Sequence, residues 1–336
     1  MAIEVADGRL ERFERYLEET VNDRRASSPV DAMIQYHFGY GDGERRRSGK
    51  RLRSQLLLLV TEQEGGAPEV GLDAAAAVEL LHNYSLVHDD IEDGDRMRHG
   101  RETVWATYGV AHGINAGDSL CALSYLALLE NRAGLPDDRL VEMTRKLHEA
   151  NLAMCAGQAR DIAFERADRV SAEGYLEMIG GKTAAMFAAS CELGAIAAGA
   201  APERVAAYAE LGRSYGMAFQ IRDDVLGTWG ATEVTGKPSG ADLARRKWTF
   251  PVVWALGGDA SPERSIVEEH YARGRMLDER EVATMIRALD ALDARSAADA
   301  TADRFLRDAD RIAGDTGIDV SGDVRAFLLA SANRSA

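Results

Sequence analysis

The chain has 336 residues, with 40 Lys and Arg against 55 Asp and Glu, which gives a formal net charge of −15. This acidic balance repels the phosphate backbone of nucleic acid, so nucleic acid is not an expected partner. Hydrophobic residues make up 46% of the chain, only 7 residues are proline, and the alternation typical of strands is missing. The composition therefore predicts an all-α fold, and the length is compatible with a single domain over residues 1–336.

Helix punctuation recurs along the chain. Ser261 before Pro262 has the sequence of a helix N-cap followed by a first-turn proline, and Asp278 with Glu281 has capping-box spacing. The polar, glycine-containing stretches 39–50 and 229–246 are predicted to be loops over a site rather than domain linkers. Helices are predicted, in chain order, over 8–24, 51–64, 72–94, 115–133, 137–166, 171–199, 203–228, 247–257, 262–273, 279–311 and 321–332.

Cysteine usage and apolar stretches indicate a cytoplasmic protein. Cys121, Cys155 and Cys191 lie in apolar stretches, and their odd number and wide spacing suit neither a disulfide framework nor a zinc site. The N-terminus is acidic and has no apolar segment long enough for a signal peptide. The stretch 184–201 contains Glu192 and several glycines, which favours a buried helix over a membrane span. We expect no stable insertion into a membrane.

The first acidic cluster, 88–93, follows the apolar helical run 78–87. Asp89 and Asp93 are four residues apart and therefore share one face of a helix. Carboxylates at the C-terminal end of a helix are opposed by one another and by the helix dipole, and a bound cation relieves both effects. Mg²⁺ takes one or two carboxylates and completes its shell with water and substrate phosphate. This cluster predicts a magnesium site for a diphosphate, although an isolated acidic pair is more often a solvated helix end.

A second acidic pair, Asp223 and Asp224, ends the apolar helical stretch 216–222. We expect the two acidic helix ends to face each other across one cavity. His82 lies seven residues before Asp89, which is two helical turns, so it is expected on the same face. Four basic side chains are candidate phosphate contacts: Arg98, Lys182, Lys237 and Lys247. Each of them alone is more typical of a surface charge.

In their order along the chain, these motifs resemble the trans-isoprenyl diphosphate synthases of the polyprenyl synthetase family. The resemblance covers nearly all of the chain and implies a large helical bundle around a central deep cavity, of the isoprenoid synthase type I fold. It also implies a homodimer and a magnesium-dependent prenyltransferase that joins isopentenyl diphosphate to an allylic diphosphate. The residues that carry it are Gly49-Lys50-Arg51-Leu52-Arg53, Asp89-Asp90-x-x-Asp93 with Arg98, Gly157-Gln158 with Asp161, Gly181-Lys182-Thr183, 219–224 and Gly236-Lys237-Pro238.

The resemblance also implies roles for individual residues. Magnesium would be bound by Asp89, Asp93 and Asp223, and the metal shell would be supported by Asp90, Asp161 and Asp224. Catalysis would depend on Asp89, Asp90, Asp93, Lys182 and Asp223. The allylic diphosphate would be held by Arg98, Lys182, Thr183, Gln220, Lys237 and Lys247. Isopentenyl diphosphate would be bound by Lys50, Arg53 and His82.

Two positions depart from the family pattern. Gly227 stands where the second acidic motif usually has a further Asp, so one outer metal contact is expected to be weaker or supplied by water. His99 stands where the family commonly has a second adjacent arginine that helps to hold isopentenyl diphosphate. We therefore hypothesise a weaker or pH-sensitive isopentenyl diphosphate site.

Product length is expected to depend on the residues below the first acidic motif. Tyr84 lies about 7.5 Å below Asp89 at the rise of an α-helix. A bulky aromatic residue at position 84, followed by a small residue such as Ser85, resembles the pattern found in family members that make geranylgeranyl diphosphate. Farnesyl diphosphate or a longer diphosphate is the alternative product. Helix periodicity alone places Ser85 beneath Asp89, so Tyr84 is equally compatible with ordinary core packing. A class I terpene cyclase and a non-catalytic accessory subunit remain alternative functions.

Overall fold

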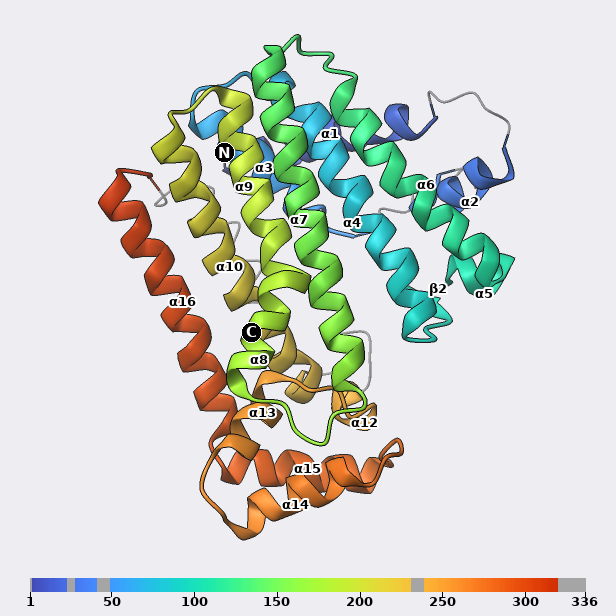
Figure 1. The fold of residues 1–336 in the computed structure, drawn as a ribbon, viewed down its shortest axis with the longest axis vertical. Helices are drawn as coiled ribbons and strands as arrows, with labels where there is room; N and C mark the ends of the chain where they lie inside the picture. Colours follow the sequence, from blue (N-terminus) through green and yellow to red (C-terminus); the bar gives the residue numbers. More distant parts are fainter. Residues whose placement is uncertain (1, 23–27, 41–48, 231–238, 320–336) are drawn as a thin grey trace. The chain divides into compact units, whose positions relative to one another are not determined.

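The computed structural model describes residues 2–22, 28–40, 49–230 and 239–319, and these residues are almost entirely helical (Figure 1). The predicted all-α class is therefore confirmed. The elements are α1 (Ala2–Asn22), α2 (Pro29–Phe38), α3 (Leu52–Gln63), the 3₁₀ helix η1 (Pro68–Gly71), α4 (Leu72–Glu92), β1 (Met97–Arg98), β2 (Arg101–Glu102), α5 (Val104–Tyr108), α6 (Val110–Leu129), α7 (Asp137–Phe164), α8 (Ala172–Ile179), the π-helical turn η2 (Gly180–Ala184), α9 (Ala185–Ala198), α10 (Pro202–Trp229), α12 (Ala241–Ala244), α13 (Phe250–Gly257), α14 (Pro262–Ala272), α15 (Glu279–Ala291) and α16 (Ala294–Thr316).

The chain divides into two compact units, residues 1–148 with 190–205 and residues 149–189 with 206–336. The first unit is organised around α4, which packs against α1, α3 and α6 (Figure 1). The alanine-rich residues 74–77 of α4 are almost fully buried, because their small side chains let neighbouring helices approach closely. The prediction of a single domain over 1–336 stays a prediction.

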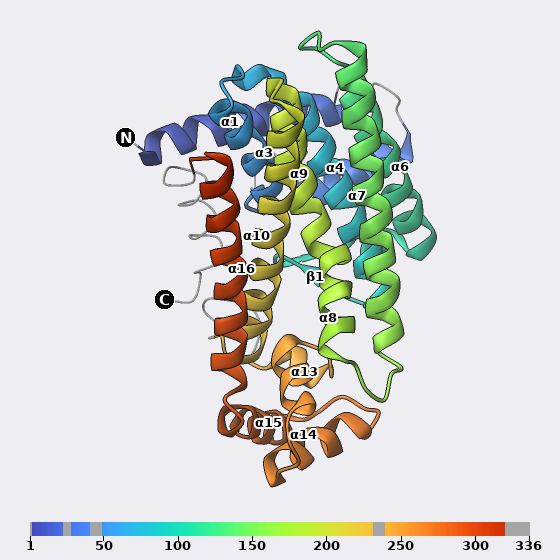
Figure 2. The same ribbon diagram turned by 60° about the vertical axis from the view of Figure 1, so that its left-hand side comes forward.

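The second unit has its own apolar core. α13 packs against α8, α14 and α16, and Figure 2 shows α14 and α15 side by side below it. Trp248 and Phe250 belong to this core, and Tyr271 of α14 packs on Trp248 with ring centroids 5.0 Å apart. The indole N–H of Trp248 donates to the Phe164 carbonyl over 2.8 Å, so its polar atom is satisfied inside an apolar environment.

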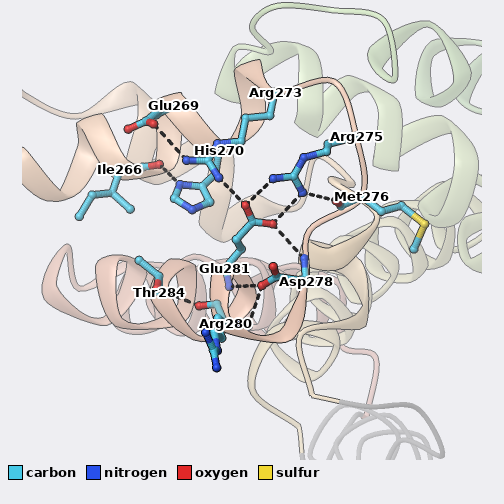
Figure 3. Close-up of polar contacts among 10 residues, drawn as sticks. All are labelled: Ile266, Glu269, His270, Arg273, Arg275, Met276, Asp278, Arg280, Glu281 and Thr284. Atoms are coloured by element: carbon cyan, nitrogen blue, oxygen red, sulfur yellow. Dashed lines mark hydrogen bonds and ion pairs between the residues drawn. The ribbon is translucent and has the colours of Figure 1, made fainter.

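Both predicted N-caps are confirmed. The Ser261 hydroxyl accepts a hydrogen bond from the Arg264 backbone N–H at 3.1 Å. The Asp278 carboxylate accepts from the Glu281 N–H at 2.9 Å, and the Glu281 carboxylate accepts from the Asp278 N–H at 3.0 Å. Hydrogen bonds from Arg275, from the Asp278 backbone and from Arg273 lower the pKa of Glu281 to about 2 (Figure 3). This capping box therefore also holds the end of α14 against the start of α15.

Tertiary context changes two predicted helices. The predicted helix 171–199 contains the π-helical turn η2, and the predicted helix 279–311 is broken before Asp293, whose φ is 53°. The helix α2 was not predicted, although Ser28 and Asp31 form a capping box that the sequence displays. The predicted helix 321–332 lies outside the described residues. Among the described helices, none is long and apolar enough to cross a membrane.

Candidate active site

The first acidic cluster ends α4 as expected. The Asp93 backbone N–H donates to the Asp89 carbonyl over 2.8 Å, so the helical turn continues through the motif. Asp90 is only 2% exposed and accepts hydrogen bonds from Arg98 Nε at 2.9 Å and from Arg98 NH2 at 2.8 Å. Burial raises the pKa of Asp90, while Arg98 opposes the shift. Asp89 is more exposed and lies 3.8 Å from the same guanidinium, so Arg98 partly neutralises this helix end.

Arg98 is positioned by a two-stranded hairpin that the sequence analysis did not predict. Strands β1 and β2 are antiparallel and pair Arg98 with Arg101. Between them, His99 and Gly100 both have positive φ, at 50° and 78°, as a two-residue hairpin turn requires. His99 is exposed at this turn. The hairpin fixes the backbone of Arg98, and the predicted role of His99 stays a prediction.

Arg53 of α3 and His82 of α4 come together, as their predicted shared role requires. Arg53 NH1 lies 3.2 Å from His82 Nε2. Burial, and then the charge of Arg53, keep the pKa of His82 well below its usual value, while burial lowers the pKa of Arg53 to about 10. A neutral imidazole with Nε2 as acceptor fits this contact. Lys50 is exposed near the start of α3, and its carbonyl accepts from Gln55 Nε2 at 2.7 Å.

A buried charge network holds the segment between Lys50 and Arg53. Arg51 has a left-handed φ of 50° at the N-cap of α3, and its side chain is 2% exposed. Its guanidinium donates to Glu14 and to Glu79, each over 2.9 Å. The sequence predicted no role for this network. The available signal was Glu79, a carboxylate inside the apolar run of α4.

Around Glu79 the network is closed by neutral donors. Ser54 Oγ donates to Glu79 Oε2 at 2.9 Å, and Asn83 Nδ2 donates to Glu79 Oε1 at 3.0 Å. Asn83 Oδ1 in turn lies 2.9 Å from His37 Nε2. Glu79 therefore fixes α3 to α4 from the inside, directly beside the pair formed by Arg53 and His82.

In the second unit, Lys182 is placed by the main chain of η2. A methyl group added at Gly157 would lie 2.7 Å from the Gly181 carbonyl carbon and still closer to the Lys182 nitrogen. A methyl group added at Gly181 would lie 2.6 Å from the Ala153 carbonyl oxygen. The backbones of α7 and η2 therefore touch, and Lys182 Nζ forms an ion pair with Asp161 Oδ2 at 2.6 Å. π-helical turns are frequent at functional sites.

A chain of hydrogen bonds connects η2 to the second acidic pair. The Thr183 hydroxyl donates to Gln220 Oε1 at 2.7 Å, and Gln220 Nε2 donates to Asp224 Oδ1 at 3.1 Å. The other Asp224 oxygen accepts from the Tyr175 hydroxyl and from the Phe250 backbone N–H. Tyr175 was not among the predicted site residues.

Asp223 and Asp224 differ in environment. Burial raises the pKa of Asp224 to about 7, although its three hydrogen-bond donors oppose that shift. Asp223 is exposed on the same helix. Asp224 is therefore suited to fixing the end of α10, whereas Asp223 is suited to meeting an ion or ligand.

Of the remaining predicted phosphate contacts, Lys237 lies outside the described residues. Lys247 is half-buried, and its backbone is fixed from both sides. Its N–H donates to the Asp242 carbonyl at 2.9 Å, and its carbonyl accepts from the Tyr271 hydroxyl at 2.7 Å.

The predicted product-length residues lie in the first unit, on α4. Tyr84 and His88 pack edge to face, with ring centroids 5.3 Å apart. The His88 ring fills the space where Gly117 of α6 would carry a side chain. Ser85 Oγ donates to the His82 carbonyl at 2.7 Å. Tyr84 is therefore part of a packed aromatic contact, and its effect on product length stays a prediction.

The carboxylates fit the chemistry of magnesium. Among the described residues, no group of three His, Cys, Asp or Glu side chains is arranged to hold a metal ion. A magnesium ion bound by these carboxylates would therefore need further ligands. Mg²⁺ commonly binds one or two carboxylates and completes its coordination shell with water and substrate phosphates. Asp89 belongs to the first unit and Asp223 to the second, so their meeting across a central cavity stays a prediction.

The all-helical fold and its acidic helix ends define a protein of the isoprenoid synthase type, and comparison with known proteins identifies the family. The polyprenyl synthetase model matches residues 43–289. A crystal structure of a polyprenyl synthetase from Streptomyces coelicolor is similar with a TM-score of 0.85 and 35% identity, covering 98% of each chain. The chain therefore belongs to the polyprenyl synthetase family.

Two relatives from Mycobacterium tuberculosis are named as short-chain synthases. A farnesyl diphosphate synthase is 40% identical over 238 residues, which are 70% of this chain and 65% of that protein. A geranylgeranyl diphosphate synthase is 40% identical over 253 residues, which are 74% of this chain and 71% of that protein. The match thus spans slightly less than two thirds of the farnesyl diphosphate synthase.

Proposed function

We propose that the protein is a magnesium-dependent trans-prenyltransferase that condenses isopentenyl diphosphate with an allylic diphosphate and releases a short-chain isoprenyl diphosphate. The observation that carries the proposal is the half-buried contact between Arg53 and His82 in the first unit. A cyclase needs no site for a second diphosphate. This contact supplies a guanidinium and an imidazole from α3 and α4, in addition to Lys182, Thr183 and Gln220 of η2 and α10. Family membership and the names of the relatives support the same reaction.

In this proposal, each set of residues has a distinct task. Bound magnesium would neutralise the charge that develops on the leaving diphosphate. Lys182, Thr183 and Gln220 hold the allylic diphosphate while its carbon–oxygen bond breaks. Arg53 and His82 hold the diphosphate of the second substrate so that its double bond attacks the allylic cation. The addition product then loses a proton, and the released diphosphate accepts it, so no Ser or Cys nucleophile is required.

The proposed product is geranylgeranyl diphosphate, with farnesyl diphosphate as the alternative. Tyr84, five residues before Asp89, supports a short product because an aromatic ring at this depth limits the growing chain. One of the two mycobacterial relatives is named as a farnesyl diphosphate synthase and the other as a geranylgeranyl diphosphate synthase, and both names fit a short-chain enzyme.

We also propose that the protein is a homodimer that meets through α6. Helix α6 exposes Val110 and Ile114 near its start and Leu126 and Leu129 near its end, each 43–50% accessible. Exposed apolar side chains gathered on one helix favour a surface that a partner covers. A cytoplasmic location remains a prediction.

The experiment is incubation of the purified chain with Mg²⁺, isopentenyl diphosphate and, separately, dimethylallyl, geranyl or farnesyl diphosphate, followed by product sizing. Elongated diphosphates are the expected products. The Asp89→Ala and Asp223→Ala variants serve as matched controls and are expected to form none. Cyclised hydrocarbons, or no turnover of any allylic substrate, would contradict the proposal. Unchanged turnover in both variants under limiting magnesium would contradict the metal assignment.

A further inference from the structure

A buried tyrosine, Tyr175 of α8, lies behind the second acidic pair. It is 1% exposed, and its hydroxyl donates to Asp224 Oδ2. Its ring meets the ring of Phe250 edge to face, with centroids 5.9 Å apart, and the Phe250 backbone N–H donates to the same oxygen over 2.8 Å. Two donors from two different helices therefore fix the orientation of the Asp224 carboxylate, which is itself only 6% exposed.

The other oxygen of this carboxylate decides how the Gln220 amide is turned. An ionised carboxylate only accepts hydrogen bonds, so the Gln220 group that faces Asp224 Oδ1 at 3.1 Å is the amide nitrogen. The amide oxygen then faces the Thr183 hydroxyl, which lies 2.7 Å away and donates its proton to it. A reversed amide would set two acceptors, Gln220 Oε1 and Asp224 Oδ1, against each other.

This arrangement leaves one donor for a ligand. The Gln220 nitrogen carries two N–H groups, and Asp224 takes one of them. Within the described parts of the chain, the second N–H donates to no protein group, and the Gln220 side chain is only half-buried. The Thr183 hydroxyl uses its single proton on Gln220 and has none left for a phosphate. Of these two side chains, Gln220 is therefore the one that can donate to an anion.

Close backbone contact sets the separation of Thr183 and Gln220. A methyl group added at Gly216 would lie 2.6 Å from Ala184 Cα, so the main chains of α10 and η2 approach closely about one helical turn before Gln220. Thr183 directly precedes Ala184 and is 6% exposed. The rotation of the amide is what remains to be set, and Asp224 sets it.

We propose that Tyr175 is a positioning residue for the allylic diphosphate: it holds Asp224, Asp224 turns the Gln220 amide, and the amide presents an N–H to the ligand. The inference rests on the proposed function, because this diphosphate is a substrate of that reaction. Tyr175 itself does not touch the substrate. Thr183 supports the amide from its other end, instead of donating to the diphosphate with its hydroxyl.

A double-mutant cycle tests whether Tyr175 acts through Gln220. Tyr175→Phe removes the hydroxyl and keeps the buried ring, and Gln220→Ala removes the amide. At pH 8, above the pKa of about 7 at Asp224, KM is measured for isopentenyl diphosphate and for the allylic substrate that turns over fastest, dimethylallyl, geranyl or farnesyl diphosphate. Thr228→Val is the matched control, because its buried hydroxyl donates to the main-chain carbonyl of Asp224 at 2.9 Å and not to the carboxylate.

Tyr175→Phe is expected to raise the KM for the allylic substrate about tenfold and to leave the KM for isopentenyl diphosphate unchanged. In the Gln220→Ala background the same substitution should cause no further rise, because the group through which it acts is gone. Thr228→Val is expected to lower the melting temperature by a similar amount and to change neither KM.

A second cycle decides the question if Tyr175→Phe does not fold. Thr183→Val should raise the KM for the allylic substrate in the unmodified chain but not in the Gln220→Ala background. Thr183→Ser, which keeps the hydroxyl, should retain the original KM. A rise of equal size in both backgrounds would show that Thr183 acts without Gln220 and would overturn the inference.

Three further results would overturn the inference and leave the proposed function standing. They are an unchanged allylic KM in a folded Tyr175→Phe variant, an equal rise with and without the Gln220 amide, and a parallel rise of both KM values. Failure of the unmodified chain to elongate any of the three allylic diphosphates would count against the proposed function, and the inference would fall with it.

Discussion

Breaking the buried network at Arg51 is expected to destabilise the protein strongly. In an Arg51→Met variant, Glu79 and Glu14 lose their shared cation. Side-chain exposures of 2% for Arg51, 5% for Glu79 and 16% for Glu14 leave little water to replace it. Removing one partner of a buried ion pair costs about 3–5 kcal/mol. Glu79 keeps its donors Ser54 and Asn83, so we expect the lower end, about 3 kcal/mol.

The double variant Arg51→Met with Glu79→Gln provides the matched control. It removes both charges while the glutamine retains the approximate shape and hydrogen-bonding capacity of Glu79. Replacing both members of a buried pair is often close to neutral, so we expect the double variant to recover at least half of the lost stability.

Urea unfolding followed by circular dichroism at pH 7 measures these free energies from the transition midpoint and slope. The KM for isopentenyl diphosphate should rise more than kcat falls, because Arg51 fixes the backbone between Lys50 and Arg53. A loss below about 0.5 kcal/mol in Arg51→Met would refute the reasoning, since that is the range of ordinary surface substitutions. A double variant no more stable than Arg51→Met would refute the assigned role of charge.

Three further predictions concern pH, packing and product length. Burial lowers the pKa of His37 to about 4, so only the unfolded chain binds its proton between about pH 6.5 and pH 4. The free energy of unfolding should therefore fall as the pH is lowered through this window. Urea unfolding at pH 7 and pH 5 should show that His37→Gln loses about 1–2 kcal/mol less stability over this change than the unmodified chain does. An equal loss in both proteins would contradict the assignment. Gly157→Ala should lower the free energy of unfolding, measured with urea, by about 1–3 kcal/mol because the added methyl group meets the Lys182 backbone. Gly314→Ala is the control, because nothing surrounds that position, and it should cause no such loss. Equal urea midpoints for the two variants would argue against the contact at Gly157. Tyr84→Ala should lengthen the products seen by chromatography, and an unchanged product distribution would remove Tyr84 as the limit.

Local chemistry explains why much of the fold was predictable from sequence. Capping at Ser261 and Asp278 depends on residues within three positions, so sequence alone identified both helix starts. The acidic ends of α4 and α10 were recognisable for the same reason, because each follows an apolar helical run. The break before Asp293 was missed because a lone aspartate inside a helical pattern is a weak signal, although aspartate tolerates the left-handed φ of 53° found there better than most residues do.

Contacts between distant segments explain what the sequence did not reveal. Glu14, Arg51 and Glu79 come from three different helices or their caps, and no spacing rule connects them. Tyr175 precedes Asp224 by 49 positions, so the acid of the motif was visible while the hydroxyl that holds it was not. A pattern within one helix predicts a face of that helix, but it does not predict which side chain from elsewhere bonds to it.

The backbone contact between α7 and η2 has a consequence for protein engineering. Because main-chain atoms of α7 and η2 approach closely at Gly157, the backbone position of Lys182 is set by main-chain contacts, and Asp161 holds its ammonium. If Tyr84 limits product length as proposed, Tyr84 and His88 are therefore positions to redesign for new hydrocarbon lengths while the backbone at Lys182 stays unchanged. Conversely, mutagenesis libraries that include Gly157 or Gly181 should yield mostly inactive members.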